Sequence, residues 1–232
     1  HTVYITDCQT GVSNEIPHLG VDEPVRTLGH FMACSNATDQ SFATELPVCN
    51  TECKILLSKQ LTADEFAGVI NVCTIPRVKM RFCYGTTSDK SLKKIQQKYK
   101  DHLKKLAHLP SSFPNNILFG ATERGGIGIS SFADEVNVSR VIAFLQHVRG
   151  NDIERELACA AVKTSETLTQ SDIPVLERRG PAPIEQEWDQ TWMGRIGDFC
   201  TEKGFTITGG QVNRGHREGD ITIMSLFNNV DK

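Results

Sequence analysis

The stretch SDKSLKKIQQKYKDHLKKLAHL (residues 88–109) decides the fold class. Apolar side chains recur in it every three or four residues, as on the buried face of a helix: Leu92, Ile95, Tyr99, Leu103 and Leu106. Seven lysines and only two acids take the other positions. A helix face that is merely solvated usually mixes both signs of charge, because Glu–Lys pairs four residues apart stabilise a helix and like charges repel. The stretch predicts a packed helix, and its outer face is either solvated or built to bind an anion.

The charge of the chain is concentrated around this stretch. Residues 77–105 hold ten Lys or Arg against two Asp, a local balance of +8; the 232-residue chain has a net charge of -3, so the remainder carries -11. Such asymmetry indicates a localised surface for an anionic partner. We expect roughly three or four of these cations to contact such a partner, since the lysines wrap much of the helix. The seven lysines of the helix are the primary candidates and three earlier residues are secondary: Lys90, Lys93, Lys94, Lys98, Lys100, Lys104 and Lys105, then Arg77, Lys79 and Arg81.

Helical periodicity continues on both sides of this stretch. Thr62 followed three residues later by Glu65 matches a capping box, in which each side chain accepts from the other residue's N–H. Pro76 favours the first turn of another helix. Further helices are predicted at residues 49–59, after Ser131 as N-cap, and after Asp152 as N-cap to about residue 167. A last helix places Trp188, Trp192, Ile196 and Phe199 in the core.

Strands are predicted mainly near the two ends of the chain. Alternating β-branched and aromatic residues predict strands at 2–6 and 24–33, the second interrupted at Gly29, and a brief extended piece at 117–119. Towards the C-terminus, residues 204–208 and 220–227 are predicted strands on either side of a polar, Gly-rich loop.

These elements together predict a mainly α fold. It is a helical bundle with short N-terminal strands and a small α+β C-terminal part. The sequence RRGPAP marks a plausible boundary near residue 178. Three parts are predicted: residues 1–35, 36–177 and 178–232.

A glycine cluster, GGIG, lies between the basic stretch and the next predicted helix. Gly126 and Gly128 match the first two glycines of a dinucleotide-binding fingerprint, and Ser131 stands where the third belongs. That fingerprint requires a second strand after the helix, whereas the residues after Gly150 have helical periodicity. We therefore interpret Gly125, Gly126 and Gly128 as a structural turn in which glycine permits positive φ and close chain approach.

Other patterns limit the class of protein. The eight cysteines have no CxxC or clustered Cys/His spacing, which disfavours structural zinc and favours buried free thiols in a reducing compartment. No apolar run approaches the roughly 20 residues of a membrane span, and no signal peptide is visible. Since the chain starts at His1 without a methionine, we expect it to be a piece of a larger protein.

Four segments occur in an order that resembles the reverse transcriptases of non-LTR retrotransposons. They are VRTLGHF (25–31), TIPRVKMRF (74–82), LPSSFPNNILFGATERGGIGISSFADE (109–135) and VSRVIAFLQHV (138–148). Each segment is a weak signal alone, and the specificity lies in their order and spacing over residues 2–162, about two thirds of the chain. The resemblance implies the end of the palm followed by the α-helical thumb, with Leu28 and Gly29 in a primer-grip-like position.

The resemblance also implies a function. The expected partners are an RNA template–DNA primer duplex and the rest of the polymerase polypeptide, with no membrane and no small-molecule cofactor. The expected location is intracellular and nuclear. Mg²⁺ is expected only in the full-length polymerase, because its carboxylates lie upstream of the LG strand in that family. The nearest N-terminal acid here is a lone Asp7, and two metal ions need several close carboxylates. This chain alone is therefore not expected to polymerise.

Two alternatives remain open from the sequence. One is a domesticated, catalytically inactive reverse-transcriptase-like scaffold module in a ribonucleoprotein, whose basic helix contacts a fixed RNA or an acidic protein face. The other is an unrelated soluble enzyme, although no GxSxG, HExxH or Cys–His constellation supports it.

Overall fold

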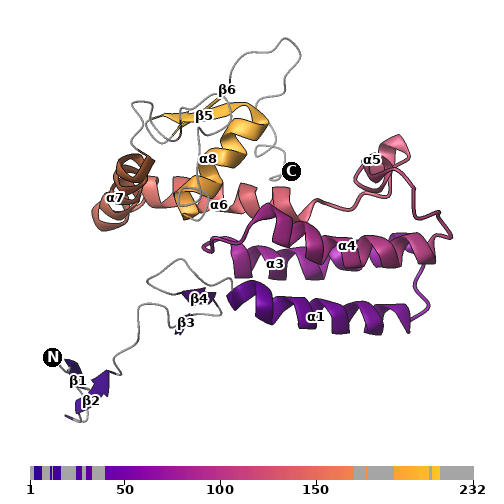
Figure 1. The fold of residues 1–232 in the computed structure, drawn as a ribbon, viewed down its shortest axis with the longest axis horizontal. Helices are drawn as coiled ribbons and strands as arrows, with labels where there is room; N and C mark the ends of the chain where they lie inside the picture. Colours follow the sequence, from indigo (N-terminus) through magenta and orange to yellow (C-terminus); the bar gives the residue numbers. More distant parts are fainter. Residues whose placement is uncertain are drawn as a thin grey trace.

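Helices make up most of the described protein (Figure 1). The computed structural model describes residues 3–6, 11, 13–16, 25–27, 30–32, 40–169, 176, 191–208 and 211–214. Its helices are α1 (Gln40–Leu57), α2 (Ala63–Val69), the π-helix η1 (Ile70–Thr74), α3 (Ile75–Phe82), α4 (Asp89–Leu106), α5 (Asn115–Leu118), the 3₁₀-helix η2 (Thr122–Arg124), α6 (Phe132–Arg149), α7 (Asp152–Thr169) and α8 (Trp192–Lys203). The predicted mainly α class is confirmed.

The described strands form three separate two-stranded antiparallel sheets. They pair β1 (Val3–Thr6) with β2 (Ser13–Ile16), β3 (Val25–Thr27) with β4 (His30–Met32), and β5 (Phe205–Thr208) with β6 (Gln211–Arg214). The strand predicted over 24–33 is therefore two strands, with Val25 opposite Met32 and Thr27 opposite His30. The strand β6 lies within the stretch predicted to be a polar loop. Alternation in Gln-Val-Asn-Arg was the available signal for it.

The predicted helix starts at Thr62, Ser88 and Ser131 are confirmed. The capping box of α2 is complete, since the Thr62 N–H donates to Glu65 Oε2 at 2.8 Å and the Glu65 N–H donates to Thr62 Oγ1 at 3.3 Å. The Ser88 hydroxyl oxygen accepts from the Ser91 N–H at the start of α4, and Ser131 caps α6 in the same way. These caps satisfy N–H groups that have no partner within the helix.

Several predicted boundaries are wrong. Helix α1 begins at Gln40, well before the predicted start at 49, because a helix held by tertiary contacts tolerates Pro47 in its interior. The piece predicted to be extended at 117–119 belongs to the short helix α5 and the residue after it. The first turn of α7 is capped by Asn151, whose side-chain oxygen accepts from the Glu154 N–H at 2.9 Å, rather than by Asp152.

Helix α3 continues directly from α2 through the π-helix η1. Pro76 lies in the first turn of α3, as predicted. A proline lacks an N–H and therefore cannot donate one of the backbone hydrogen bonds of a helix. The wider π-helical turn before it accommodates this missing bond. This continuous segment presents a face of α3 to α6.

Helix α6 connects two hydrophobic cores. Its first half contributes Phe132 and Val136 to a core formed with α1 to α4. Its second half contributes Val141 and Phe144 to a core formed with α7, α8 and β5 (Figure 1). The predicted apolar stripe of α4 lies in the first core, where Leu92, Ile95, Tyr99 and Leu103 are buried and Leu106 is half-buried. This packing fixes α4 from behind.

The predicted strand at 220–227, the boundary near residue 178, Asp7, and the primer-grip-like Leu28 and Gly29 lie outside the described residues. Within the described ranges, no helix combines the length and apolarity that crossing a bilayer requires.

Candidate nucleic-acid interface

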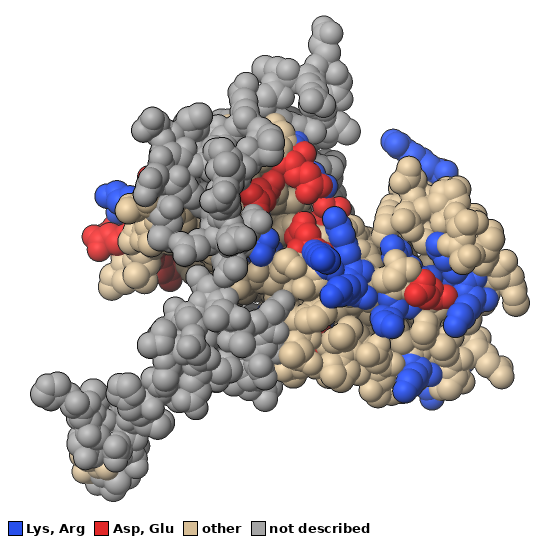
Figure 2. All heavy atoms as spheres, in the orientation of Figure 1, with Lys and Arg blue, Asp and Glu red and all other residues tan. Residues whose placement is uncertain are grey.

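The outer face of α4 carries a cluster of exposed lysines. Because consecutive residues in a helix are rotated by 100°, the side opposite Leu92 and Leu103 collects the polar positions. We define the lysine face as the exposed lysines on this side: Lys90, Lys93, Lys94, Lys98 and Lys105. Figure 2 shows Lys and Arg side chains gathered over the helical unit that contains α4, with few Asp or Glu among them.

The lysines of the lysine face stand apart from the ion pairs of the described protein. No ion pair between those residues involves any of its five lysines. Five ammonium groups on one side of an 18-residue helix repel one another. Salt largely screens this repulsion only between groups more than about 10 Å apart. A polyanion that lies along this side relieves the repulsion.

Two further lysines of α4 contact a neighbouring loop. The Lys100 ammonium lies 5.8 Å from the ring centroid of Phe119, and burial together with the nearby Lys104 lowers the pKa of Lys100. Lys104 is buried, and its ammonium donates to the Ser111 carbonyl at 2.6 Å. Lys104 therefore holds the loop and is not part of the lysine face. Lys100 remains half-buried at the edge of the lysine face.

The secondary candidates Arg77, Lys79 and Arg81 are engaged in ion pairs. Arg77 Nε lies 2.8 Å from Glu45 Oε1, and Arg81 Nε lies 2.9 Å from Glu45 Oε2. Lys79 Nζ lies 2.9 Å from Glu135 Oε2. These three cations neutralise carboxylates of the protein itself, so the proposal below does not rest on them.

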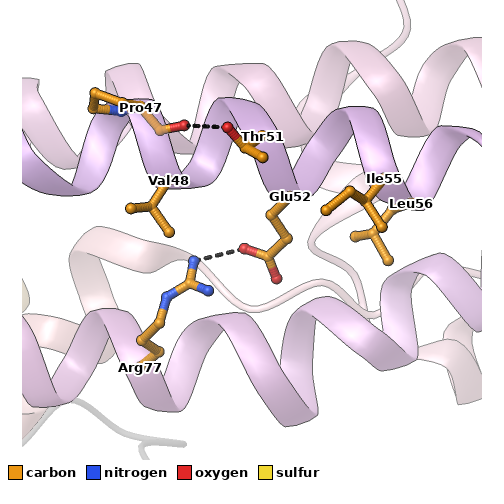
Figure 3. A pocket seen from close by; sticks show the side chains of 7 residues that line it. All are labelled: Pro47, Val48, Thr51, Glu52, Ile55, Leu56 and Arg77. Atoms are coloured by element: carbon orange, nitrogen blue, oxygen red, sulfur yellow. Dashed lines mark hydrogen bonds and ion pairs between the residues drawn. The ribbon is translucent and has the colours of Figure 1, made fainter.

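Arg77 and Glu52 also line a pocket of about 500 Å³ on α1 (Figure 3). Its other lining side chains are Pro47, Val48, Thr51, Ile55 and Leu56. Arg77 Nη2 donates to Glu52 Oε2 at 2.6 Å, and the Tyr99 hydroxyl donates to the same oxygen at 2.8 Å. The guanidinium is thus neutralised by two carboxylates, and these described lining residues offer no unpaired cation to an anionic ligand.

Burial and hydrogen bonding shift the pKa values of the titratable groups around this ion pair. Burial raises the pKa of Glu52 on its own, but hydrogen bonds from Thr74, Tyr99 and Arg77 outweigh it and hold the pKa below its ordinary value. Burial raises the pKa of Cys49 to about 11 and that of Cys53 to about 12, so both thiols stay protonated at neutral pH. A protonated thiol is a weak nucleophile, and the cluster is structural.

The glycine cluster forms a tight turn beside α4. Gly125 and Gly128 have φ angles of +80° and +75°. A Cβ atom at Gly126 would overlap the backbone of Gly120, whose carbonyl accepts the Gly128 N–H at 2.9 Å. The glycines thus allow the backbone around Gly126 to pack directly against the backbone of Gly120. We define residues 109–128 as the glycine loop, which Lys100 and Lys104 hold against α4.

The residues that follow the glycine loop are also held by protein groups. The Ser130 N–H donates to Asn71 Oδ1 at 3.1 Å, and the Gln96 amide donates to the Ser130 carbonyl at 3.1 Å. The Asp134 N–H at the start of α6 is capped by Ser131. These bonds occupy the backbone groups that a phosphate cradle would present to a nucleotide.

One feature of the lysine face was not predicted from the sequence. The Gln97 amide donates to Asp101 Oδ1 at 2.6 Å, and both residues are exposed. Their spacing of four residues within a run of lysines was the available signal.

The described cysteines carry free thiols. Cys49, Cys53, Cys83 and Cys200 are buried as expected, whereas Cys73 and Cys159 are exposed. In the described part of the chain, His, Cys, Asp and Glu side chains form no group of three or more arranged to hold a metal ion.

Comparisons of this chain with protein-family models, with curated proteins and with solved structures found no match.

Proposed function

We propose that this protein binds the sugar–phosphate backbone of a nucleic-acid duplex through the lysine face of α4. The role is that expected of the thumb of a non-LTR reverse transcriptase, which grips the template–primer duplex. One observation carries the proposal: five exposed lysines lie on one side of a single helix, and no ion pair among the described residues neutralises them.

The support behind α4 favours binding by a preformed surface. The helix packs on α1, α2 and α6 through the first core, and its Gln96 and Lys104 side chains bond neighbouring loops. A rigid row of cations loses little entropy on binding. Lysines attract phosphates as point charges and do not contact base edges. We therefore expect an affinity that falls steeply with salt and varies little with nucleic-acid sequence.

The salt dependence of binding tests the proposal. If four phosphates are neutralised, the slope of log K against log salt for an RNA–DNA hybrid is roughly -3 to -4. Replacing Lys94, Lys98 and Lys105 by Gln should weaken binding and make the slope shallower by about 0.9 for each phosphate that is no longer neutralised. Binding of fluorescently labelled hybrids, measured by anisotropy at rising salt, gives both quantities.

A matched control lies on α7. Lys163 is exposed, and α7 packs on α6 and α8 rather than on α4. Lys163→Gln changes the net charge by one unit and should leave the slope unchanged. Binding that ignores salt, or a triple variant that binds like the unchanged protein, contradicts the proposal.

A further inference from the structure

The lysine face has a polar pair at its centre. Gln97 and Asp101 lie on successive turns of α4, and the Gln97 amide donates to Asp101 Oδ1 at 2.6 Å. Lys93 and Lys94 precede the pair by one turn, and Lys105 follows Asp101 by one turn. A nucleic-acid backbone whose phosphates contact lysines on both sides of the pair passes over Gln97 and Asp101.

Asp101 forms no close ion pair among the described residues, although its charge favours the protonated form of the neighbouring Lys100. An acid four residues before a lysine is well placed to form an ion pair along a helix, as Asp101 is before Lys105. Among the described residues, however, no ion pair includes Asp101, and its one hydrogen bond there comes from Gln97. The carboxylate is thus oriented by a neutral donor, and Oδ2 retains its capacity to accept a further hydrogen bond.

The carboxylate of this pair disfavours phosphate as its own partner. A carboxylate repels a phosphate, whereas it accepts a strong, charge-assisted hydrogen bond from a hydroxyl group. A nucleic-acid backbone offers such a donor between its phosphates only where the sugar is ribose. A-form duplexes display these 2′-hydroxyls in a wide, shallow minor groove that a protein surface can reach.

We infer that the Gln97–Asp101 pair accepts a hydrogen bond from a ribose 2′-hydroxyl, so that α4 distinguishes a ribose strand from a deoxyribose strand. The inference rests on the proposed function, because it requires the flanking lysines to hold the backbone. It adds a residue-level basis for specificity to a surface that otherwise reads charge alone.

The experiment compares two RNA–DNA hybrids of one sequence. One has an ordinary RNA strand, and in the other the strand carries 2′-fluoro sugars, which keep the A-form but cannot donate a hydrogen bond. The unchanged protein should bind the ribose hybrid roughly tenfold more tightly, the fold-change expected of one hydrogen bond to a charged group. In Asp101→Ala the two affinities should become equal, and Asp101→Asn, which keeps an acceptor oxygen, should retain part of the preference.

Glu123→Ala is the matched control, since Glu123 is an exposed acid of η2 outside α4. It should leave the ribose preference unchanged. Equal binding of both hybrids by the unchanged protein overturns the inference, as does an Asp101→Ala variant that binds both more tightly and keeps their ratio. In either case a steep salt slope would leave the proposed function standing, whereas a protein that binds neither hybrid refutes both.

Discussion

Single charged residues of α1 and α3 form a polar network. Glu45 is fully buried, and its carboxylate lies within 3 Å of the guanidinium groups of both Arg77 and Arg81. Glu52, two turns further along α1, takes the other arm of Arg77. Removing one partner from such a network leaves a charge uncompensated in the interior, which costs more than a surface pair contributes. The network therefore fixes how α1 and α3 pack.

The acid stability of the protein should depend on Glu52. Its pKa is lower in the folded than in the unfolded protein, so between these two values the unfolded state binds more protons. The stabilisation is complete above the unfolded value of about 4.3 and is lost as the pH falls through the lower folded value. We expect the free energy of unfolding to decline on that acid side, and Glu52→Gln to be less stable at pH 7 and to decline less steeply.

Urea unfolding followed by circular dichroism from pH 7 to pH 3 measures this dependence. Glu123→Gln serves as the control, because Glu123 is exposed and has no ion pair among the described residues. Its acid-side decline should match that of the unchanged protein. A Glu52→Gln variant with an unaltered decline would show that the network does not favour the ionised carboxylate.

At the scale of elements, the glycine loop and α4 support one another. Lys104 and Lys100 reach from the helix to Ser111 and Phe119 in the loop, while the turn at Gly126 closes the loop on itself. Two cations of the helix are thereby directed away from solvent. The helix sequence alone does not separate them from the five lysines of the lysine face, because that distinction depends on where the loop packs.

Gly126→Ala should disrupt this element. The added methyl group would overlap the backbone of Gly120, and overpacking of this kind costs about 1–3 kcal/mol because a backbone cannot move aside as a side chain can. Thermal unfolding should show the loss in stability. In addition, hydrogen exchange should increase at Ile127 and Gly128, whose N–H groups donate to Ile117 and Gly120.

The chain offers a matched control for this substitution. Gly68 lies inside α2, and a Cβ atom there meets no heavy atom within 4 Å. Gly68→Ala should therefore raise the free energy of unfolding by about 0.5–1 kcal/mol through helix propensity. Equal effects at both positions would mean that the Gly120–Gly126 approach does not constrain the fold.

At the scale of the whole molecule, local patterns predicted the helices and missed what joins them. The apolar stripe from Leu92 to Leu103 and the caps at Thr62 and Ser131 were readable because helical period and capping are local. The pairing of Arg77 with Glu45 was not, since it joins residues 32 positions apart. The sequence did hold a signal for this interface. Glu45 and Glu52 lie at helical spacing, as do Arg77 and Arg81, so one helix face carries two acids and another carries two bases of opposite charge.

The two cores should be separable by a change at Trp192. This side chain packs in the second core, and its indole Nε1–H donates to the Cys83 carbonyl at the end of α3 at 2.7 Å. Trp192→Phe keeps an aromatic ring beside Tyr84 and Phe144 but removes the donor, at a cost of about 1 kcal/mol. Amides of α8 and β5 should then exchange several-fold faster, by local opening of the second core. Amides of α4 should keep their exchange rates, because the first core does not include Trp192. Faster exchange in α4 as well would contradict this prediction. It would show that α6 transmits the loss of stability and that the two cores unfold together.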